Sequence, residues 1–240
     1  MEILHDVYML YGSCYANICN VYCVKGPDGL ILFDTADSDA DIAVIEANLR
    51  YWGLAKEPIT HVFLSHKHFN HIGNGYYFQA KGAKVVAGAE DADHIETGAQ
   101  DPINDSAPFP VRRYIPCRVD IRVADGNRVD AAGLQVECIH TPGHTNGSMF
   151  YRVKVHEKTL LFTGDVLSVG PECSGAKLGW EGGVEHDRRL YLQTIRQTMH
   201  IHADAILPGH FQLGLVHADA ILKSMLKEAM HAWRRPMLEE

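Results

Sequence analysis

The chain has 240 residues, of which 46% are hydrophobic and 22% charged, as is usual for a globular protein. Its formal net charge of −8 argues against a nucleic-acid surface, because phosphate binding requires clustered Lys and Arg. No apolar run approaches the length of about 20 residues that crosses a bilayer, and the N-terminus lacks the pattern of a secretory signal. We therefore expect a single domain over residues 1–240, located in the cytoplasm, with no nucleic-acid or membrane partner.

The six cysteines, at positions 14, 19, 23, 117, 138 and 173, show no CxxC spacing. This scatter favours neither a zinc knuckle nor a disulfide framework. We expect the cysteines to be small, partly buried hydrophobic residues.

The first third of the chain predicts three strands and then a helix. Apolar stretches at residues 3–10, 17–24 and 29–34 are typical of a strand meander. Residues 38–53, "SDADIAVIEANLRYWG", place apolar residues at near-helical spacing between a Ser- and Asp-rich start and a glycine. A continuous apolar strand, "ITHVFLS", then runs into the histidine cluster "SHKHFNH" at residues 65–71.

The rest of the chain predicts a second round of strands followed by helices. Residues 97–118 are rich in proline and show little periodicity, so we interpret them as a long surface loop that covers a site. The other expected elements are a helix at 71–82, a strand at 83–88, strands within 119–141 and 147–165, a helix around 186–200, a strand at 203–210 and a final helix near 218–232. Two such rounds predict two packed sheets with helices outside them.

Four strands end in small turn residues that are followed by a histidine or an aspartate. These ends are "VFLSH" at His66, "CIHTPGH" at His144, "LLFTGD" at Asp165 and "AILPGH" at His210. Strands of one sheet system deliver their ends to a common edge, so the four side chains can meet there. Imidazole and carboxylate are the ligands that zinc or iron binds in a catalytic site.

The histidine cluster itself can face two positions. His66 and His68 are two apart in an extended loop and can project to the same side, whereas Asn70 and His71 can turn toward a second position. That geometry can serve two metal ions. Alternatively, His71 could cap a helix, and His144 and His210 could be turn residues bonded to backbone.

These motifs resemble the metallo-β-lactamase superfamily, from "LILFDTAD" through "ILPGH". The family motif His-x-His-x-Asp-His matches His66, His68 and His71, with Asn70 in the aspartate position. The resemblance implies an α+β fold, a four-layer αββα sandwich. It also implies one metal at His66, His68 and His144, a second at His71 and His210, and a bridging Asp165.

The same resemblance implies a hydrolase of a small ester, thioester or lactone that uses two zinc ions, with iron or manganese as alternatives. Asp165 is similar to the bridging residue of the glyoxalase and lactonase branches, so β-lactam cleavage is disfavoured. Only about 30 residues follow His210, which disfavours a glutathione thioesterase of the standard size, and nuclease activity is the weakest branch. A small-molecule substrate is expected, and a homodimer is the protein partner to test.

Asn70 raises two competing hypotheses. Its amide offers one weak oxygen ligand and no proton-accepting carboxylate, so we expect a weakened second site and slower turnover. The loss of a carboxylate would also suit a one-iron oxygenase similar to the persulfide dioxygenases of the superfamily. A third hypothesis is a metal-binding or regulatory protein without turnover.

Two irregular segments, 97–118 and 168–183, are predicted to form the substrate walls, with Trp180 as an apolar contact. Asp34 and Thr35 are expected to support the ligands from behind. The remaining histidines are predicted to be surface or packing residues, with His186 as the first exception to consider.

Overall fold

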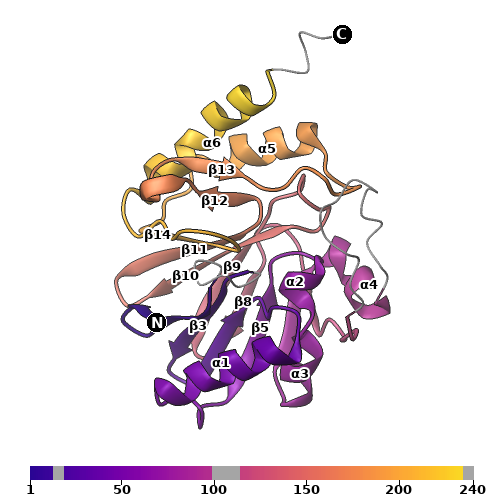
Figure 1. Cartoon of the computed structure of the whole chain (residues 1–240), viewed down its shortest axis with the longest axis vertical. Coiled ribbons are helices and arrows are strands. Elements are labelled where there is room, and N and C mark those ends of the chain that lie inside the picture. Colours follow the sequence, from indigo (N-terminus) through magenta and orange to yellow (C-terminus); the bar gives the residue numbers. More distant parts are fainter. Residues whose placement is uncertain (13–18, 99–113, 235–240) are drawn as a thin grey trace.

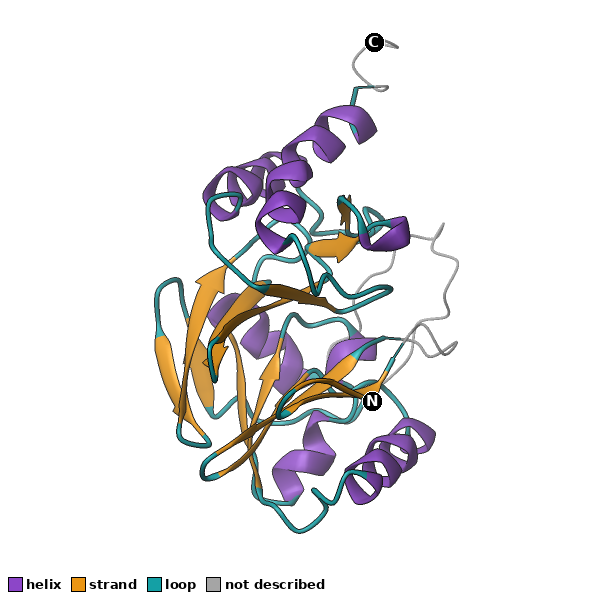
Figure 2. Cartoon of the chain, turned by 90° about the vertical axis from the view of Figure 1, so that its left-hand side faces the viewer, coloured by secondary structure: helices purple, strands orange, loops and turns teal. Residues whose placement is uncertain are grey.

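The computed structural model describes residues 1–12, 19–98 and 114–234, which form two mixed β-sheets with helices on their outer faces (Figure 1, Figure 2). The seven strands of the first sheet lie in chain order: β1 Glu2–Leu4, β2 Val7–Tyr11, β3 Val21–Gly26, β4 Gly29–Phe33, β5 Ile59–Leu64, β6 Lys84–Gly88 and β7 Ile121–Val123. The second sheet has the order β14-β11-β10-β9-β8: β8 Arg128–Ala131, β9 Leu134–His140, β10 Met149–Val155, β11 Lys158–Gly164 and β14 Ala205–Pro208. A separate pair is formed by β12 Leu167–Val169 and β13 Ala176–Leu178.

The helices divide between the two outer faces, as Figure 1 shows. The helices on the first sheet are α1 Asp39–Tyr51, α2 Phe69–Ile72, α3 Gly75–Ala80 and α4 Ala89–Thr97. Those on the second sheet are α5 Arg188–Thr198 and α6 Ala218–Ala232, with a short 3₁₀ turn, η2 Pro171–Cys173, between β12 and β13. Among the helices of these described ranges, none is both long and apolar enough to cross a membrane.

Three apolar layers hold the four structural layers together. Side chains alternate along each strand, so that Leu30 and Leu32 of β4 face the helices while Ile31 and Phe33 face the second sheet. In the layer between the sheets, the rings of Phe33 and Phe162 stack with centroids 3.6 Å apart. The third layer packs β10 and β11 against α5 and α6. The expected αββα sandwich is therefore confirmed.

Several local expectations were wrong in detail. Residues 3–10 form two antiparallel strands because the chain turns at Asp6, whose φ is +61°. The helix expected over residues 71–82 is divided into α2 and α3 at Gly73 and Asn74. Helix α4 was not predicted, and residues 168–183 are not irregular throughout, since β12 and β13 pair within them.

The exposure of the cysteines also differs from expectation at one position. Cys19, Cys23, Cys117 and Cys138 are buried, as predicted, whereas Cys173 is exposed in the turn between β12 and β13. Cys14 lies outside the described residues, and so does most of the loop predicted over 97–118.

Candidate metal centre

The candidate ligands follow strands that all end at one rim of the sandwich. In the first sheet, β4 and β5 are parallel, and Asp34 and His66 come directly or almost directly after them. In the second sheet, β9, β11 and β14 run in one direction and are followed by His144, Asp165 and His210. Because the strands are held in register by their ladders, these ends meet without any long loop to position them.

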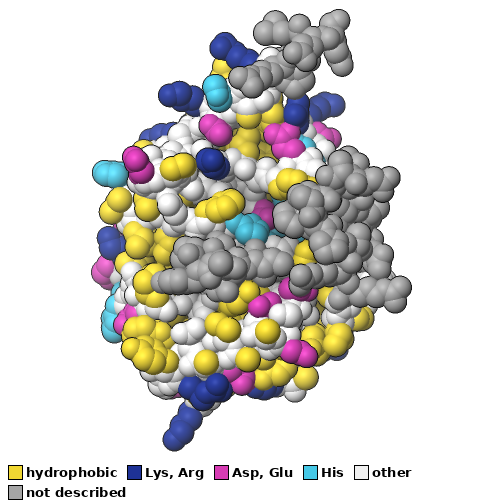
Figure 3. Space-filling model, in the orientation of Figure 1, with side chains coloured by type: hydrophobic (Ala, Val, Ile, Leu, Met, Phe, Trp, Pro, Cys, Tyr) yellow, Lys and Arg dark blue, Asp and Glu magenta, His cyan; other side chains and the backbone are white. Residues whose placement is uncertain are grey.

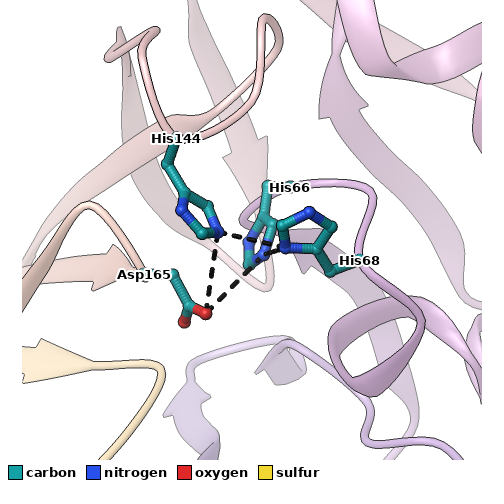
Figure 4. A group of neighbouring side chains, drawn as sticks. All are labelled: His66, His68, His144 and Asp165. Carbon is teal, nitrogen blue, oxygen red and sulfur yellow. Dashed lines mark hydrogen bonds and ion pairs between the residues drawn. The ribbon is translucent and has the colours of Figure 1, made fainter. Parts of the chain in front are cut away.

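The first cluster contains His66, His68, His144 and Asp165, which point toward one another from three separate loops (Figure 4). His68 Nδ1 lies 2.9 Å from His66 Nε2 and 3.0 Å from His144 Nε2. Asp165 Oδ2 lies 3.9 Å from His66 Nε2 and 3.7 Å from His144 Nε2. Three ring nitrogens and a carboxylate oxygen thus surround one point.

The second cluster shares Asp165 and adds His71 and His210. Asp165 lies 3.3 Å from His71 Nε2 through Oδ1 and 3.1 Å from His210 Nε2 through Oδ2. Asn70 is in the first turn of α2, and its amide nitrogen is 3.3 Å from His210 Nε2. The asparagine is therefore placed beside the second cluster rather than the first.

The outer nitrogens of two rings of the first cluster indicate their tautomers. His144 Nδ1 is 3.2 Å from the carbonyl oxygen of Trp180, which can only accept, so Nδ1 carries the proton. His66 Nδ1 is 2.9 Å from Ser65 Oγ, whose own hydrogen is donated to Asp34 at 2.9 Å. His66 must then donate from Nδ1 as well. Both rings consequently present the lone pair of Nε2 to the cluster.

Asp34 supports both clusters from behind. Its Oδ2 accepts from Ser65 Oγ and, at 2.8 Å, from His71 Nδ1, while Oδ1 accepts from the backbone of Ser65 at 2.8 Å. A single carboxylate thus fixes His66 through Ser65 and His71 directly, as outer partners of metal ligands commonly do. The φ of Asp34 is +60°, a left-handed conformation that aspartate tolerates better than most residues. Thr35 Oγ1 donates to the carbonyl oxygen of His71 at 2.9 Å, so both expected supporting residues contact the cluster.

The donor atoms fit a cation better than they fit one another. His68 Nδ1 faces two lone pairs and can donate to only one of them. Asp165 Oδ1 is buried and, among the described residues, has an ion-pair contact with His71 Nε2 at 3.3 Å but no hydrogen bond. Buried oxygen and nitrogen acceptors that converge in this way are costly unless a positive charge lies among them.

Burial and neighbouring charges perturb the pKa values of these groups in opposite directions. Burial lowers the pKa of His68 and His144 to about 3 and holds that of His66 well below its usual range. Burial also disfavours charged His71, but Asp165 and Asp34 outweigh it and raise the pKa of His71 to about 10. Burial likewise opposes ionised Asp165, yet His210 and His71 hold the pKa of its carboxyl well below the usual range. Without a metal ion, the three imidazoles of the first cluster are therefore neutral at pH 7, whereas His71 of the second cluster is positively charged.

Two glycines let the backbone pass close to the ligands. A Cβ atom at Gly209 would lie 2.5 Å from Asp165 Oδ1 and 2.8 Å from His71 Cε1. A Cβ atom at Gly179 would lie 1.9 Å from the carbonyl oxygen of Asp165. Sequence reasoning singled out neither residue, although Gly209 directly precedes a candidate ligand.

Trp180 lies beside the first cluster, with its ring centroid 6.3 Å from that of His68 and 39% of its surface exposed. Its ring also packs over Gly182, where a Cβ atom would come within 2.1 Å of the indole. His186 belongs to neither cluster, and its Nε2 is buried without a hydrogen bond from the part of the chain that is described. Figure 3 shows histidine and acidic side chains near the centre of this face, with hydrophobic side chains around them.

One ion pair close to the site was not predicted. The Lys67 ammonium, between His66 and His68 in sequence, is buried and lies 2.5 Å from Glu185 Oε1. The backbone nitrogen of Lys67 also donates to Asp91 at 2.9 Å. The ion pair ties the histidine loop to the segment that carries Trp180, and the bond to Asp91 ties it to α4. The paired residues are far apart in sequence, so no local pattern could have indicated the contact.

A four-layer sandwich with two His/Asp clusters at one rim defines a class of metal-site proteins, and sequence comparison identifies the family. The Metallo-beta-lactamase superfamily pattern matches residues 14–210, so the chain belongs to this superfamily. A hydroxyacylglutathione hydrolase from Maricaulis maris is 30% identical over 154 residues, which are 60% of this chain and 49% of that protein. An uncharacterised protein from Mycobacterium tuberculosis is 35% identical over 91 residues, 36% of this chain and 38% of that protein. The matched regions thus span about half or less of the length of these relatives.

Solved structures agree with the fold. A Cronobacter sakazakii metallo-β-lactamase described by a HARLDQ motif, in its S60 mutant form, superposes with a TM-score of 0.75 over 100% of this chain and 94% of that chain. Its sequence identity is 19%. At this identity the likeness shows the fold alone.

Proposed function

We propose that the chain is a metal-dependent hydrolase of a small ester, thioester or lactone, with a two-zinc site weakened at its second position. The observation that carries the proposal is the convergence of two ligand clusters on Asp165, one of whose oxygens accepts no hydrogen bond from the described residues. The hydroxyacylglutathione hydrolases among its relatives support a hydrolytic reaction. These residues would hold divalent ions, which would supply a nucleophilic water at neutral pH and polarise the carbonyl to be cleaved.

The residues of the chain divide the remaining work. His66, His68 and His144 would hold the tighter ion as neutral ligands, and His71, His210 and Asp165 would hold the second. Asp34 would keep two ligand rings oriented, and Trp180 would cover the apolar part of the substrate. Asn70 can orient a polar group by hydrogen bonding but cannot accept a proton, so turnover is slower than with a carboxylate.

The direct test is elemental analysis of protein purified without added metal, followed by a panel of esters, thioesters and lactones. More than one zinc ion per chain held by the two ligand clusters, together with turnover of at least one panel class, would support the proposal. One iron per chain with oxygen uptake would instead support the persulfide dioxygenase alternative, which the neutral Asn70 amide beside His210 favours. Metal binding without product from any substrate would support a silent or regulatory protein.

Filling the second site should release a proton. The pKa of His71 is raised to about 10 in the metal-free chain, so the ring is charged at pH 7, whereas a metal ligand must be neutral. The imidazoles of the first cluster are already neutral. Calorimetric titration with zinc in buffers of different ionisation enthalpy should therefore show about one more proton released with the second ion than with the first. Equal release for both ions would contradict this assignment.

Trp180→Ala should alter substrate binding more than metal content. The contact with His144 is made by the backbone carbonyl of Trp180, which the substitution leaves in place. Loss of the indole should raise KM for the best apolar substrate severalfold, while Trp180→Phe, which keeps an aromatic ring, should stay close to the wild type. KM and metal content are measured for all three proteins. An unchanged KM across the panel in Trp180→Ala would remove the residue from the substrate wall.

A further inference from the structure

A second group of histidines lies at the opposite rim of the sandwich. His5 and Asp6 form the turn between β1 and β2, and His156 lies in the turn between β10 and β11. Asp6 precedes β2 and His156 precedes β11, whereas the candidate ligand Asp165 follows the end of β11. Figure 1 shows the N-terminal strands beside the β10–β11 turn, far from the ends that carry the metal ligands.

The three side chains converge on one carboxylate oxygen. His156 Nε2 lies 2.9 Å from Asp6 Oδ2, and His5 Nε2 lies 3.7 Å from the same atom. The two imidazole rings are stacked, with centroids 4.7 Å apart and an angle of 15° between their planes. One ligand atom from each residue lies within 4.8 Å of the others, a spacing that could hold an ion.

The backbone holds this arrangement in place. Asp6 and His156 have φ values of +61° and +51°, in the left-handed region that residues other than glycine adopt uncommonly, although aspartate and histidine do so more often than most. The backbone carbonyl oxygen of Asp6 accepts a hydrogen bond from the backbone nitrogen of Lys25 at 2.9 Å. The backbone nitrogen of Asp6 donates to Glu2 Oε1 at 3.3 Å. Glu2 Oε1 also lies 3.8 Å from His5 Nδ1, so the outer nitrogen of that ring faces a carboxylate, as in many metal sites.

The ammonium of Lys158 is directed away from the three side chains. Lys158 begins β11 next to this turn, and its ammonium lies 3.5 Å from Asp204 Oδ1. The side chains of His5 and His156 are 79% and 53% exposed, which leaves room for water to complete a coordination shell. Access from solvent is therefore open.

We propose that His5, Asp6 and His156 form a separate binding site for one divalent late transition-metal ion, such as Zn²⁺ or Ni²⁺. Two imidazoles and a carboxylate are the donor set that these ions prefer, and water fills the remaining positions. His5 and Asp6 belong to the first sheet and His156 to the second, so the ion links the two sheets at the rim opposite the candidate metal centre. Because the three ligands meet only in the folded chain, the ion stabilises the fold.

Titration of the protein as purified with ZnCl₂, and separately with NiCl₂, tests this site. The variants Asp6→Asn and His156→Asn each delete one ligand and keep a residue that tolerates a left-handed backbone. Wild-type protein should bind one ion per chain more than either variant. At a free ion concentration of 100 times the dissociation constant, the bound ion should raise the thermal unfolding midpoint of the wild type by about 5–10 °C relative to the variants.

His202→Ala provides the matched control. His202 Nδ1 lies 3.0 Å from Asp219 Oδ2 in an exposed pair, and this pair belongs to no group of three potential metal ligands within the described residues. The control should keep the additional ion, and all four proteins should keep the same ion content and hydrolysis rate at the candidate metal centre. If the wild type, Asp6→Asn and His156→Asn all bind the same number of zinc ions, and all bind the same number of nickel ions, the proposal is overturned.

Discussion

Replacing His144 with alanine is expected to remove the more tightly held ion and to lower hydrolysis to below about 1% of the wild-type rate. The substitution deletes one of three neutral nitrogen donors, whose lone pair is directed at the cluster by the bond between Nδ1 and the Trp180 carbonyl. Loss of an outer partner alone typically costs about 10–100-fold in metal affinity or activity, and loss of a ligand should cost at least as much. Elemental analysis after gel filtration and initial rates on the best substrate measure both effects.

His66→Ala should behave in the same way, because its Nε2 faces the same point as that of His144. His186→Ala is the matched control: His186 is a half-buried histidine outside both clusters. The His186→Ala protein should keep the metal content of the wild type and most of its activity. If His66→Ala or His144→Ala retains the full metal content, the first cluster is assigned wrongly. If His186→Ala loses as much metal as His144→Ala, the loss reports a disturbed loop rather than a missing ligand.

Replacing Asn70 with aspartate is expected to raise the metal content of the candidate metal centre toward two ions per chain and to increase hydrolysis by about ten-fold or more. The side chain already lies beside the second cluster, 3.3 Å from His210 Nε2. A carboxylate there would add a second negative charge next to Asp165 and would attract a cation more strongly. It would also supply a proton acceptor, and general acid–base help is typically worth about 10²–10⁴-fold in rate.

Asn70→Ala distinguishes the effect of losing the amide from the effect of gaining a carboxylate at position 70. It removes the amide and adds no carboxylate, so it should gain neither metal nor activity. Metal content and kcat are compared among the wild type, Asn70→Ala and Asn70→Asp under the same zinc concentration. If the aspartate variant keeps the metal stoichiometry and rate of the wild type, or if the wild type already works as a one-iron oxygenase, the two-metal hydrolase hypothesis is wrong.

Some local expectations failed because they depend on contacts between distant segments. The apolar run at residues 3–10 reads as one strand, yet a turn at Asp6 lets its two halves pair. Helix α4 has a weak apolar pattern, and its buried Asp91 is satisfied by Lys67, Thr145 and Gly147 from other loops. Such partners lie too far along the chain for periodicity to indicate them.

The sequence by itself determined the four layers and the order of the candidate ligands, because both depend on local patterns. Strand alternation and helical spacing set which faces are apolar, and a strand followed by small residues and then His or Asp marks where a ligand can stand. Only the tertiary structure decided how those ligands are oriented. Asp34 meets Ser65 and His71, Trp180 meets His144, and Asp6 meets His156, each across tens of residues or more. The Asp34 contacts arise at the ends of neighbouring strands of the first sheet, whereas the contact of Asp6 with His156 arises only because the two sheets pack face to face.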